Sequence, residues 1–208
     1  GAQTVDIKAT SLNHLDIWVR KGFANQQLPL PLVLGSDGAG EIASIGKDVS
    51  NWKVGDKVVI QPGIINKVSK EFLGHENYSP NYGILGETQD GVQSEYVSLD
   101  VSNVHRMARH LSFSEAASMQ LVFMTAYQMI VKRAKLKSNE IILIYGATSG
   151  VGSAAIQIAK DIGATVIATV GNKSKDSYAF EMGADYVFIH DGSLKNNILN
   201  TLKKKIDV

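Results

Sequence analysis

The pattern of apolar and polar positions changes character near residue 112. Before that point, short apolar segments are separated by frequent turn signals. The turn at Gly55-Asp56 predicts a strand over residues 57–60, and the turn at Asp90-Gly91 predicts another over residues 92–99. Many short strands between such turns are typical of a small barrel or sandwich. The first half of the chain is therefore expected to be β.

Beyond residue 112 the first signals are helical. Ser112 and Glu115 have the spacing of a capping box, in which the hydroxyl caps the helix and the acid stands three positions on. This predicts a helix over about residues 115–119, and a second helical stretch is expected over about residues 125–133. Residues 138–140 then break the pattern.

From residue 141 on, strands and helices alternate. The expected strands cover residues 141–145, 166–170 and 186–189, and the expected helices cover about residues 151–162, 175–182 and 196–205. Gly163 and Gly183 follow the first two helices as stop signals. Residues 206–208 resemble the start of a fourth strand. Alternation of this kind predicts an α/β fold with a doubly wound parallel sheet.

A glycine-rich loop joins the first of these strands to its helix. Its residues are Gly146, Ala147, Thr148, Ser149, Gly150, Val151 and Gly152. Thr148 departs from strict GxGxxG spacing, yet the loop has the required context between an apolar strand and a helix. Small residues let the backbone approach a pyrophosphate, and the helix N-terminus faces the anion with free N–H groups. We therefore expect a dinucleotide-binding loop, with Gly152 and Ala155 allowing close helix packing; a merely tight turn is the alternative.

Composition narrows the classes of function. The 208 residues carry a net charge of +1 and are 44% hydrophobic and 20% charged, so charge favours neither nucleic acid nor a membrane surface as partner. The sequence contains no cysteine, which removes disulfides, thiolate catalysis and thiolate metal sites. It shows no apolar run of membrane-spanning length, so a cytoplasmic protein is expected. Lysines 203–205 are interpreted as a solvated helix face.

Three stretches together give a family resemblance: residues 11–22, residues 34–42 and residues 146–160. They resemble the medium-chain dehydrogenase/reductase family, in particular its alcohol-dehydrogenase-like and quinone-reductase-like branches. The resemblance implies a GroES-like β-barrel domain over residues 1–120, a Rossmann domain over residues 121–208 and an active site between them. It also implies a small-molecule substrate, a homodimer or homotetramer, and a chain that lacks the first barrel strands and the second half of the Rossmann sheet.

The resemblance also gives the positions of the family's zinc ligands. Zinc-binding members have a cysteine where this chain has Asn13, a Gly-His-Glu where it has Gly35-Ser36-Asp37, and a third ligand near Leu121. The four cysteines of their second zinc site match Asn66, Ser69, Phe72 and Ser79. Neutral oxygens and apolar groups are poor substitutes for thiolate and imidazole, so we expect no metal at either site.

A substitute metal site is not expected. His14, Asp16 and Asp37 are the available donors, but on a strand adjacent side chains point to opposite faces, which would turn His14 away from Asn13 and Asp16. His75, in the lobe of the second site, is expected to lie at the surface.

Zinc-free, quinone-reductase-like members share the pattern Leu-Asn-x-x-Asp. By resemblance, Asn13, Asp16, Trp18 and Thr125 are the candidate residues of the nicotinamide cleft. The alternatives are that Asp16 caps a loop and that Trp18 packs in the core. Without a Lewis acid, quinones and enones accept hydride more easily than simple carbonyls, and Asn13 or Thr125 could donate a hydrogen bond to the developing oxyanion. An alcohol dehydrogenase and a non-catalytic cofactor-binding protein are the alternative functions.

The strand over residues 166–170 indicates which cofactor binds. NAD-selective sites have an acid about 20 residues beyond the glycine loop, but this strand ends in apolar residues. Gly171, Asn172, Lys173, Ser174 and Lys175 follow, and the first acid is Asp176. Two lysines and neutral donors suit a 2′-phosphate. We therefore predict NADP(H) in preference to NAD(H); the alternative is a solvated lysine loop that accepts either cofactor.

Overall fold

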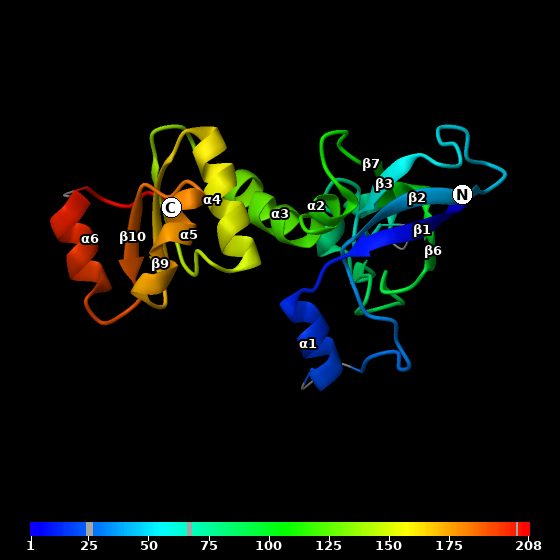
Figure 1. Ribbon diagram of the computed structural model, residues 1–208, viewed down its shortest axis with the longest axis horizontal. Coiled ribbons are helices and arrows are strands. Elements are labelled where there is room, and N and C mark those ends of the chain that lie inside the picture. Colours follow the sequence, from blue (N-terminus) through cyan, green and yellow to red (C-terminus); the bar gives the residue numbers. More distant parts are fainter. Residues whose placement is uncertain (24–26, 66–67, 203) are drawn as a thin grey trace. The chain divides into compact units, whose positions relative to one another are not determined.

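The computed structural model describes residues 1–23, 27–65, 68–202 and 204–208. The chain forms two compact units, Gly1–Leu121 and Val122–Val208, shown from blue to green and from green to red in Figure 1. Across the described ranges, no helix has the length and apolar character that crossing a lipid bilayer requires.

The first unit is built on a five-stranded antiparallel sheet with the order β6-β1-β2-β3-β7. The strands are β1 (Ala2–Thr10), β2 (Gly38–Ile45), β3 (Lys57–Ile60), β6 (Tyr96–Asp100) and β7 (Val104–Arg106). A separate pair is formed by β4 (Gly63–Ile64) and β5 (Gly83–Ile84). Alternate side chains of these strands, among them Val5, Ile42 and Val58, point inward and form the core of the unit. The expectation of a β-rich first half is confirmed.

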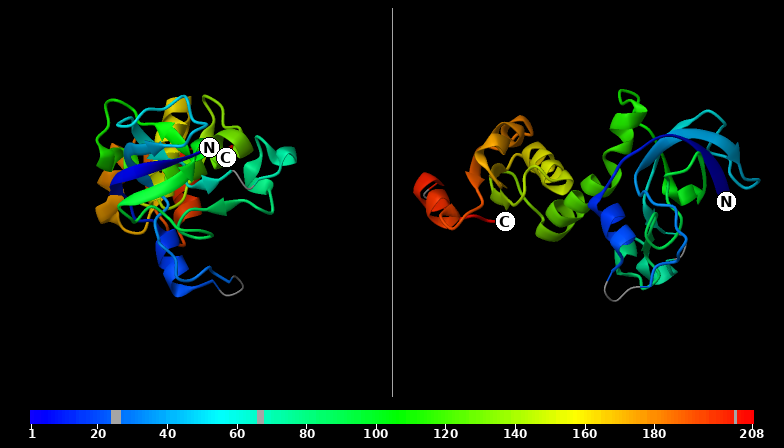
Figure 2. Two further views of the ribbon diagram at one scale, coloured as in Figure 1. Left: turned by 90° about the vertical axis from the view of Figure 1, so that its right-hand side faces the viewer. Right: turned by 60° about the horizontal axis from the view of Figure 1, so that its bottom comes forward.

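Short helices complete the first unit. They are α1 (His14–Lys21), α2 (Phe113–Ala117), and the 3-10 helices η1 (Lys70–Phe72), η2 (Glu76–Tyr78) and η3 (Val101–Asn103). The capping box of α2 is confirmed: the Glu115 carboxylate accepts a hydrogen bond from the Ser112 N–H at 2.8 Å, and the Ser112 hydroxyl accepts one from the Glu115 N–H at 3.2 Å. In the views of Figures 1 and 2, α1 projects away from the sheet.

Two boundary predictions in this part of the chain are wrong. The strand expected over residues 92–99 begins only at Tyr96, because the backbone before it pairs with residues 33–35 instead: Gly91 donates to Val33 and Val92 donates to Gly35. The second helical stretch begins at Gln120 as α3 (Gln120–Tyr127) and continues as the π-helix η4 (Gln128–Ala134). Its first turn is nearly all apolar and so shows no helical period.

The second unit is a three-stranded parallel sheet with the order β10-β9-β8. Its strands and helices are β8 (Ile141–Ile144), α4 (Gly150–Ile162), β9 (Thr165–Val170), η5 (Lys173–Lys175), α5 (Asp176–Glu181), β10 (Tyr186–Ile189) and α6 (Leu194–Leu202). The expected strands and helices are thus all present, and Gly163 ends α4 in the left-handed conformation (φ 90°). The α6 helix ends at Leu202, before the predicted residue 205; Lys204 and Lys205 are exposed, and Lys203 lies outside the described residues.

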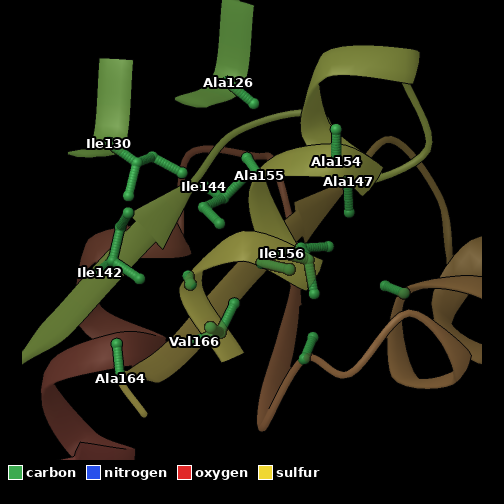
Figure 3. Close-up of a cluster of buried hydrophobic side chains, with 14 of the residues drawn as sticks. Ala126, Ile130, Ile142, Ile144, Ala147, Ala154, Ala155, Ile156, Ala164 and Val166 are labelled. Carbon is green, nitrogen blue, oxygen red and sulfur yellow. The ribbon is translucent and has the colours of Figure 1, made fainter. Parts of the chain in front are cut away.

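Helices cover both faces of the parallel sheet. Ile142 and Val166 pack with Ala155 and Ile156 of α4 in one cluster, drawn in Figure 3. The neighbouring residues Ile141 and Ile167 face the other side and pack with Leu194 and Ile198 of α6. Because alternate strand residues are buried on opposite faces, the strands are largely apolar along their whole length. The predicted α/β class and doubly wound arrangement are confirmed.

The final residues extend this sheet beyond β8. Val208 donates from its N–H to the Ile141 carbonyl at 3.1 Å and accepts from the Leu143 N–H at 2.9 Å. The Asp207 carboxylate accepts from the Ile141 N–H at 2.8 Å. These bonds place residues 206–208 along β8 without forming a regular strand, and a strand continuing from them would give the order third-second-first-fourth. In sheets of this order, ligands bind outside the carboxyl ends of the strands where the order reverses.

Candidate functional site

The glycine-rich loop follows the carboxyl end of β8 and is fixed to β9. The Ala147 N–H donates to the Thr169 carbonyl at 2.9 Å, and the Gly146 N–H donates to the Thr169 hydroxyl at 3.2 Å. Gly146 has a positive φ of 68°. Ala147 is fully buried, whereas Thr148, Ser149 and Gly150 are exposed. Residues 148–150 of the loop are therefore accessible to solvent, while residues 146 and 147 are fixed to β9 by hydrogen bonds.

The N-terminus of α4 has the features of an anion site. Ser149 is its N-cap and accepts a hydrogen bond from the Gly152 N–H at 3.0 Å. Within the described part of the chain, the N–H groups of Gly150 and Val151 have no recorded partner, as expected for the first turn of a helix. A Cβ at Gly152 would lie 2.2 Å from the Gly146 carbonyl oxygen, so only glycine fits there. The backbone can thus approach a pyrophosphate closely, and the residues present fit a dinucleotide.

A cavity of about 490 Å³ adjoins this loop. Loop residues Ser149, Val151 and Gly152 line one side, and apolar residues that include Ile144 and Tyr145 line the rest. A cavity that combines apolar walls with residues of a helix N-terminus is suited to a ligand with both a flat ring and an anionic group.

The segment after β9 carries the predicted phosphate donors. Gly171, Asn172, Lys173 and Lys175 are all exposed, and the last two belong to η5. In the ranges that the structure describes, neither lysine forms an ion pair. Asp176 begins α5. The end of β9 therefore holds exposed cations and no acid.

In the first unit, the residues at the family's catalytic zinc positions are engaged with protein groups. Ser36 is fully buried and donates its hydroxyl to the Leu85 carbonyl at 2.8 Å. The Asn13 amide nitrogen donates to the Asp37 carboxylate at 3.0 Å, and the Leu121 N–H donates to the other oxygen of that carboxylate at 2.8 Å. The Ser11 hydroxyl is a third donor at 3.1 Å. Asp37, 1% exposed, is therefore the centre of this cluster.

Residues 14–21 are the main correction to the sequence interpretation. They form the helix α1 and not a strand, so the alternation argument that turned His14 away from Asn13 and Asp16 does not apply. For Asp16 that argument was wrong even for a strand, because positions 14 and 16 would share one face. Asn13 is the N-cap, and the Asp16 carboxylate accepts from its backbone N–H at 2.7 Å. The Asn-x-x-Asp spacing is the signal that should have indicated a helix start.

The four predicted catalytic residues have different surroundings. Asp16 is 6% exposed and also accepts from the Gly35 N–H at 3.1 Å, as expected of a carboxylate that caps a loop. Trp18 is 52% exposed and lies 5.8 Å from the His14 ring, so the alternative of core packing is wrong. Asn13 is half-buried beside Asp37, and Thr125 is exposed on α3 in the second unit. Their roles in chemistry stay predictions.

The lobe that matches the second zinc site is formed by short 3-10 turns. Ser69 is the N-cap of η1, Phe72 ends it, and the buried Ser79 accepts from the Asn81 N–H at 3.2 Å; Asn66 lies outside the described residues. His75 is exposed beside Tyr78, as expected. In the described part of the chain, no three His, Asp or Glu side chains gather where they could hold a metal ion.

Comparison with known proteins agrees with this architecture. The model of the alcohol dehydrogenase GroES-like domain matches residues 1–109, and that of the zinc-binding dehydrogenase family matches residues 150–208. The chain is 32% identical to a crotonyl-CoA carboxylase/reductase of Cereibacter sphaeroides, covering 86% of this chain and 43% of the relative. It is 27% identical to the quinone oxidoreductase of Homo sapiens, covering 97% of this chain and 53% of the relative.

Among solved structures, an NAD-dependent alcohol dehydrogenase superimposes with a TM-score of 0.92 at 42% identity, covering 97% of this chain and 60% of that one. The chain spans about half the length of the curated relatives that it matches.

Proposed function

Since the chain belongs to the medium-chain dehydrogenase/reductase family, we propose that the protein is a zinc-independent oxidoreductase that reduces a quinone, an enone or a similar activated carbonyl compound with NADPH. The observation that carries this proposal is the pairing of an intact dinucleotide loop with a zinc position occupied by hydrogen-bonded polar side chains. Gly146 to Gly152 retain the cofactor-binding geometry, while Asn13, Ser36 and Asp37 offer no thiolate or imidazole.

The cofactor, when bound, supplies the hydride, and the chain supplies binding and orientation. The N–H groups at the start of α4 would hold the pyrophosphate, and the close approach of Gly152 to Gly146 would let the backbone lie near it. Lys173 and Lys175 would hold the 2′-phosphate of NADPH. At the acceptor, the Asn13 amide donates a hydrogen bond to the oxygen on which negative charge develops. This donor is weaker than a metal ion, which is why the proposal is limited to acceptors that are already activated.

The relatives support acceptors of this kind. One is a quinone oxidoreductase, and another is a crotonyl-CoA carboxylase/reductase, whose name contains an α,β-unsaturated acyl group. Both acceptor types take hydride at a conjugated position and develop charge on an oxygen. A single hydrogen-bond donor near that oxygen is sufficient assistance for such a reaction.

An alcohol dehydrogenase is the second candidate function, favoured by the 42% identity to a solved NAD-dependent alcohol dehydrogenase. Under this alternative the protein would oxidise simple alcohols with NAD. A cofactor-binding protein without catalysis would bind NADPH and turn over no acceptor at all. The three functions therefore differ in their substrates and can be separated by direct assay.

We predict the following outcome for an acceptor panel. With NADPH, the whole protein should reduce quinones and enones, and its rate with ethanol and other simple alcohols should be lower by about a hundredfold or more. Elemental analysis of chelator-free protein should find zinc far below stoichiometric amounts. Rapid alcohol oxidation together with stoichiometric zinc would establish the alcohol dehydrogenase function instead.

A second prediction concerns the choice of cofactor. Lys173→Ala and Lys175→Ala should each weaken NADPH binding about fivefold to tenfold and leave NADH binding unchanged, because only NADPH carries the 2′-phosphate. Titration of both cofactors by fluorescence measures this. Lys137→Ala is the matched control, since Lys137 is exposed and precedes β8, at the opposite end of that strand from the glycine loop. A wild-type preference for NADH would contradict the assignment.

Two further expectations stay predictions. The family resemblance implies a homodimer or homotetramer, which sedimentation of the whole protein would measure. A cytoplasmic location is expected only from the lack of long apolar runs in the sequence.

A further inference from the structure

Asp37 is a buried acid at the position where zinc-binding members have the glutamate of the Gly-His-Glu triplet, and the sequence interpretation gave it no role beyond that of a possible metal donor. Its carboxylate is 1% exposed and accepts hydrogen bonds from three neutral donors: the Ser11 hydroxyl, the Asn13 amide and the Leu121 N–H. In the described ranges no lysine, arginine or histidine pairs with it. Burying a carboxylate without a counter-ion is costly, and here burial raises the pKa of Asp37 while its hydrogen bonds oppose that rise.

We propose that Asp37 is a positioning residue, which fixes the Asn13 amide in one orientation so that one N–H of this amide remains available to the oxygen of the acceptor. The hydrogen-bond donors and acceptors of the two side chains allow only this orientation. An ionised carboxylate only accepts, whereas an asparagine amide donates at nitrogen and accepts at oxygen. Only the nitrogen of Asn13 can therefore face Asp37, at the observed 3.0 Å. An amide nitrogen carries two protons, so the second stays free when the first is bound.

The backbone of Asn13 is fixed independently. The Asp16 carboxylate accepts from the Asn13 N–H at 2.7 Å and ties it to the first turn of α1. Asn13 is thus held by one carboxylate at its main chain and by a second at its side chain. A donor held in this way loses little entropy when it meets a developing oxyanion, which is the condition for effective electrostatic stabilisation. This inference rests on the proposed function for its catalytic part.

A double-mutant cycle in the whole protein tests the catalytic part. Asn13→Ala should lower kcat about a hundredfold, and Asp37→Asn about tenfold or more, with the Kd for NADPH unchanged in both. The double variant should be no slower than Asn13→Ala within about twofold, because the two residues act through one hydrogen bond. The proposal would be overturned if the fold-decreases in kcat of the two single variants multiplied in the double variant, or if Asp37→Asn left kcat unchanged.

The matched control is Asp56→Asn, another carboxylate of the same unit, which accepts from the Lys53 N–H at 3.1 Å and pairs with Arg106 at 3.5 Å. It should leave kcat within about twofold of wild type even where it lowers the melting temperature. If Asp37→Asn does not fold, Asp37→Glu serves in its place: the carboxylate is kept but displaced by one methylene, and an undiminished kcat would equally overturn the proposal.

The orientation of the Asn13 amide can be measured separately by nuclear magnetic resonance. In nitrogen-labelled protein, the side-chain NH₂ resonances of Asn13 should shift in Asp37→Asn, or in Asp37→Glu where that variant is used, and stay in place in Asp56→Asn. Unchanged Asn13 resonances in the Asp37 variant would show that the carboxylate does not hold the amide. This measurement needs no turnover. A wild-type protein that reduced no acceptor would refute the proposed function, and the Asn13 resonances would still show whether Asp37 holds the amide.

Discussion

Replacing Gly152 by valine is expected to weaken NADPH binding by roughly a hundredfold, or about 2.7 kcal/mol, through overpacking of the loop. The physical reason is a backbone contact: a Cβ at this position would lie 2.2 Å from the carbonyl oxygen of Gly146 and 3.0 Å from the Ser149 hydroxyl. Because the nearest atom belongs to the main chain, no side chain can rotate away to make room. The helix start and the loop would separate, and the N–H groups would no longer converge on the pyrophosphate. Isothermal titration with NADPH measures the change.

Gly192→Ala is the control for this experiment. Gly192 is exposed in the same unit, and a Cβ there meets no atom within 4 Å, so affinity should equal that of wild type. A Gly152→Val protein that bound NADPH normally would show that the close approach of α4 to the loop is not needed for binding.

Asp16→Ala is expected to lower the free energy of unfolding of the first unit by about 2–4 kcal/mol, because it leaves the N–H groups of Asn13 and Gly35 without their acceptor. Both groups donate to the Asp16 carboxylate, and the side chain is 6% exposed, so water replaces it poorly. Urea unfolding followed by tryptophan fluorescence is the suitable measurement, since the two tryptophans of the chain, Trp18 and Trp52, both belong to the first unit.

Asp48→Ala provides the comparison, because Asp48 is exposed and its removal should change stability by no more than about 0.5 kcal/mol. The binding of NADPH by the Asp16 variant should stay close to wild type. A variant that unfolds at the wild-type urea concentration yet has lost turnover would assign Asp16 to the chemistry and not to the support of the loop.

Local signals explain why the second unit could be predicted well. Ser149 caps the start of α4, Gly163 ends it and Gly183 follows α5 with a positive φ, while the strands are largely apolar runs. The bounds of β10 agree with the prediction to the residue. Periodicity and caps act over a few residues, which is the range that a sequence pattern can report.

The first unit depends more on contacts between distant residues. The strand β6 begins late because residues 91–93 pair with residues 33–35, and α3 begins early with a turn whose Leu121 N–H is held by a carboxylate 84 positions away. No local pattern reports such partners. In the candidate site, Asn13 was identified through the resemblance, whereas Asp37 was considered only as a metal ligand and its hydrogen bonds became visible only in the structure.

The complete burial of Ser36 has a consequence for metal binding. Its hydroxyl is bonded to the Leu85 carbonyl in a space that an imidazole would overfill, and a cysteine at position 13 would leave Asp37 without its amide donor. A family-type zinc ligand set at positions 13 and 36 would therefore require several substitutions together, since each single substitution is expected to cost stability before the set is complete. The buried hydrogen bonds at these two positions thus make every stepwise route to such a ligand set costly in folding free energy.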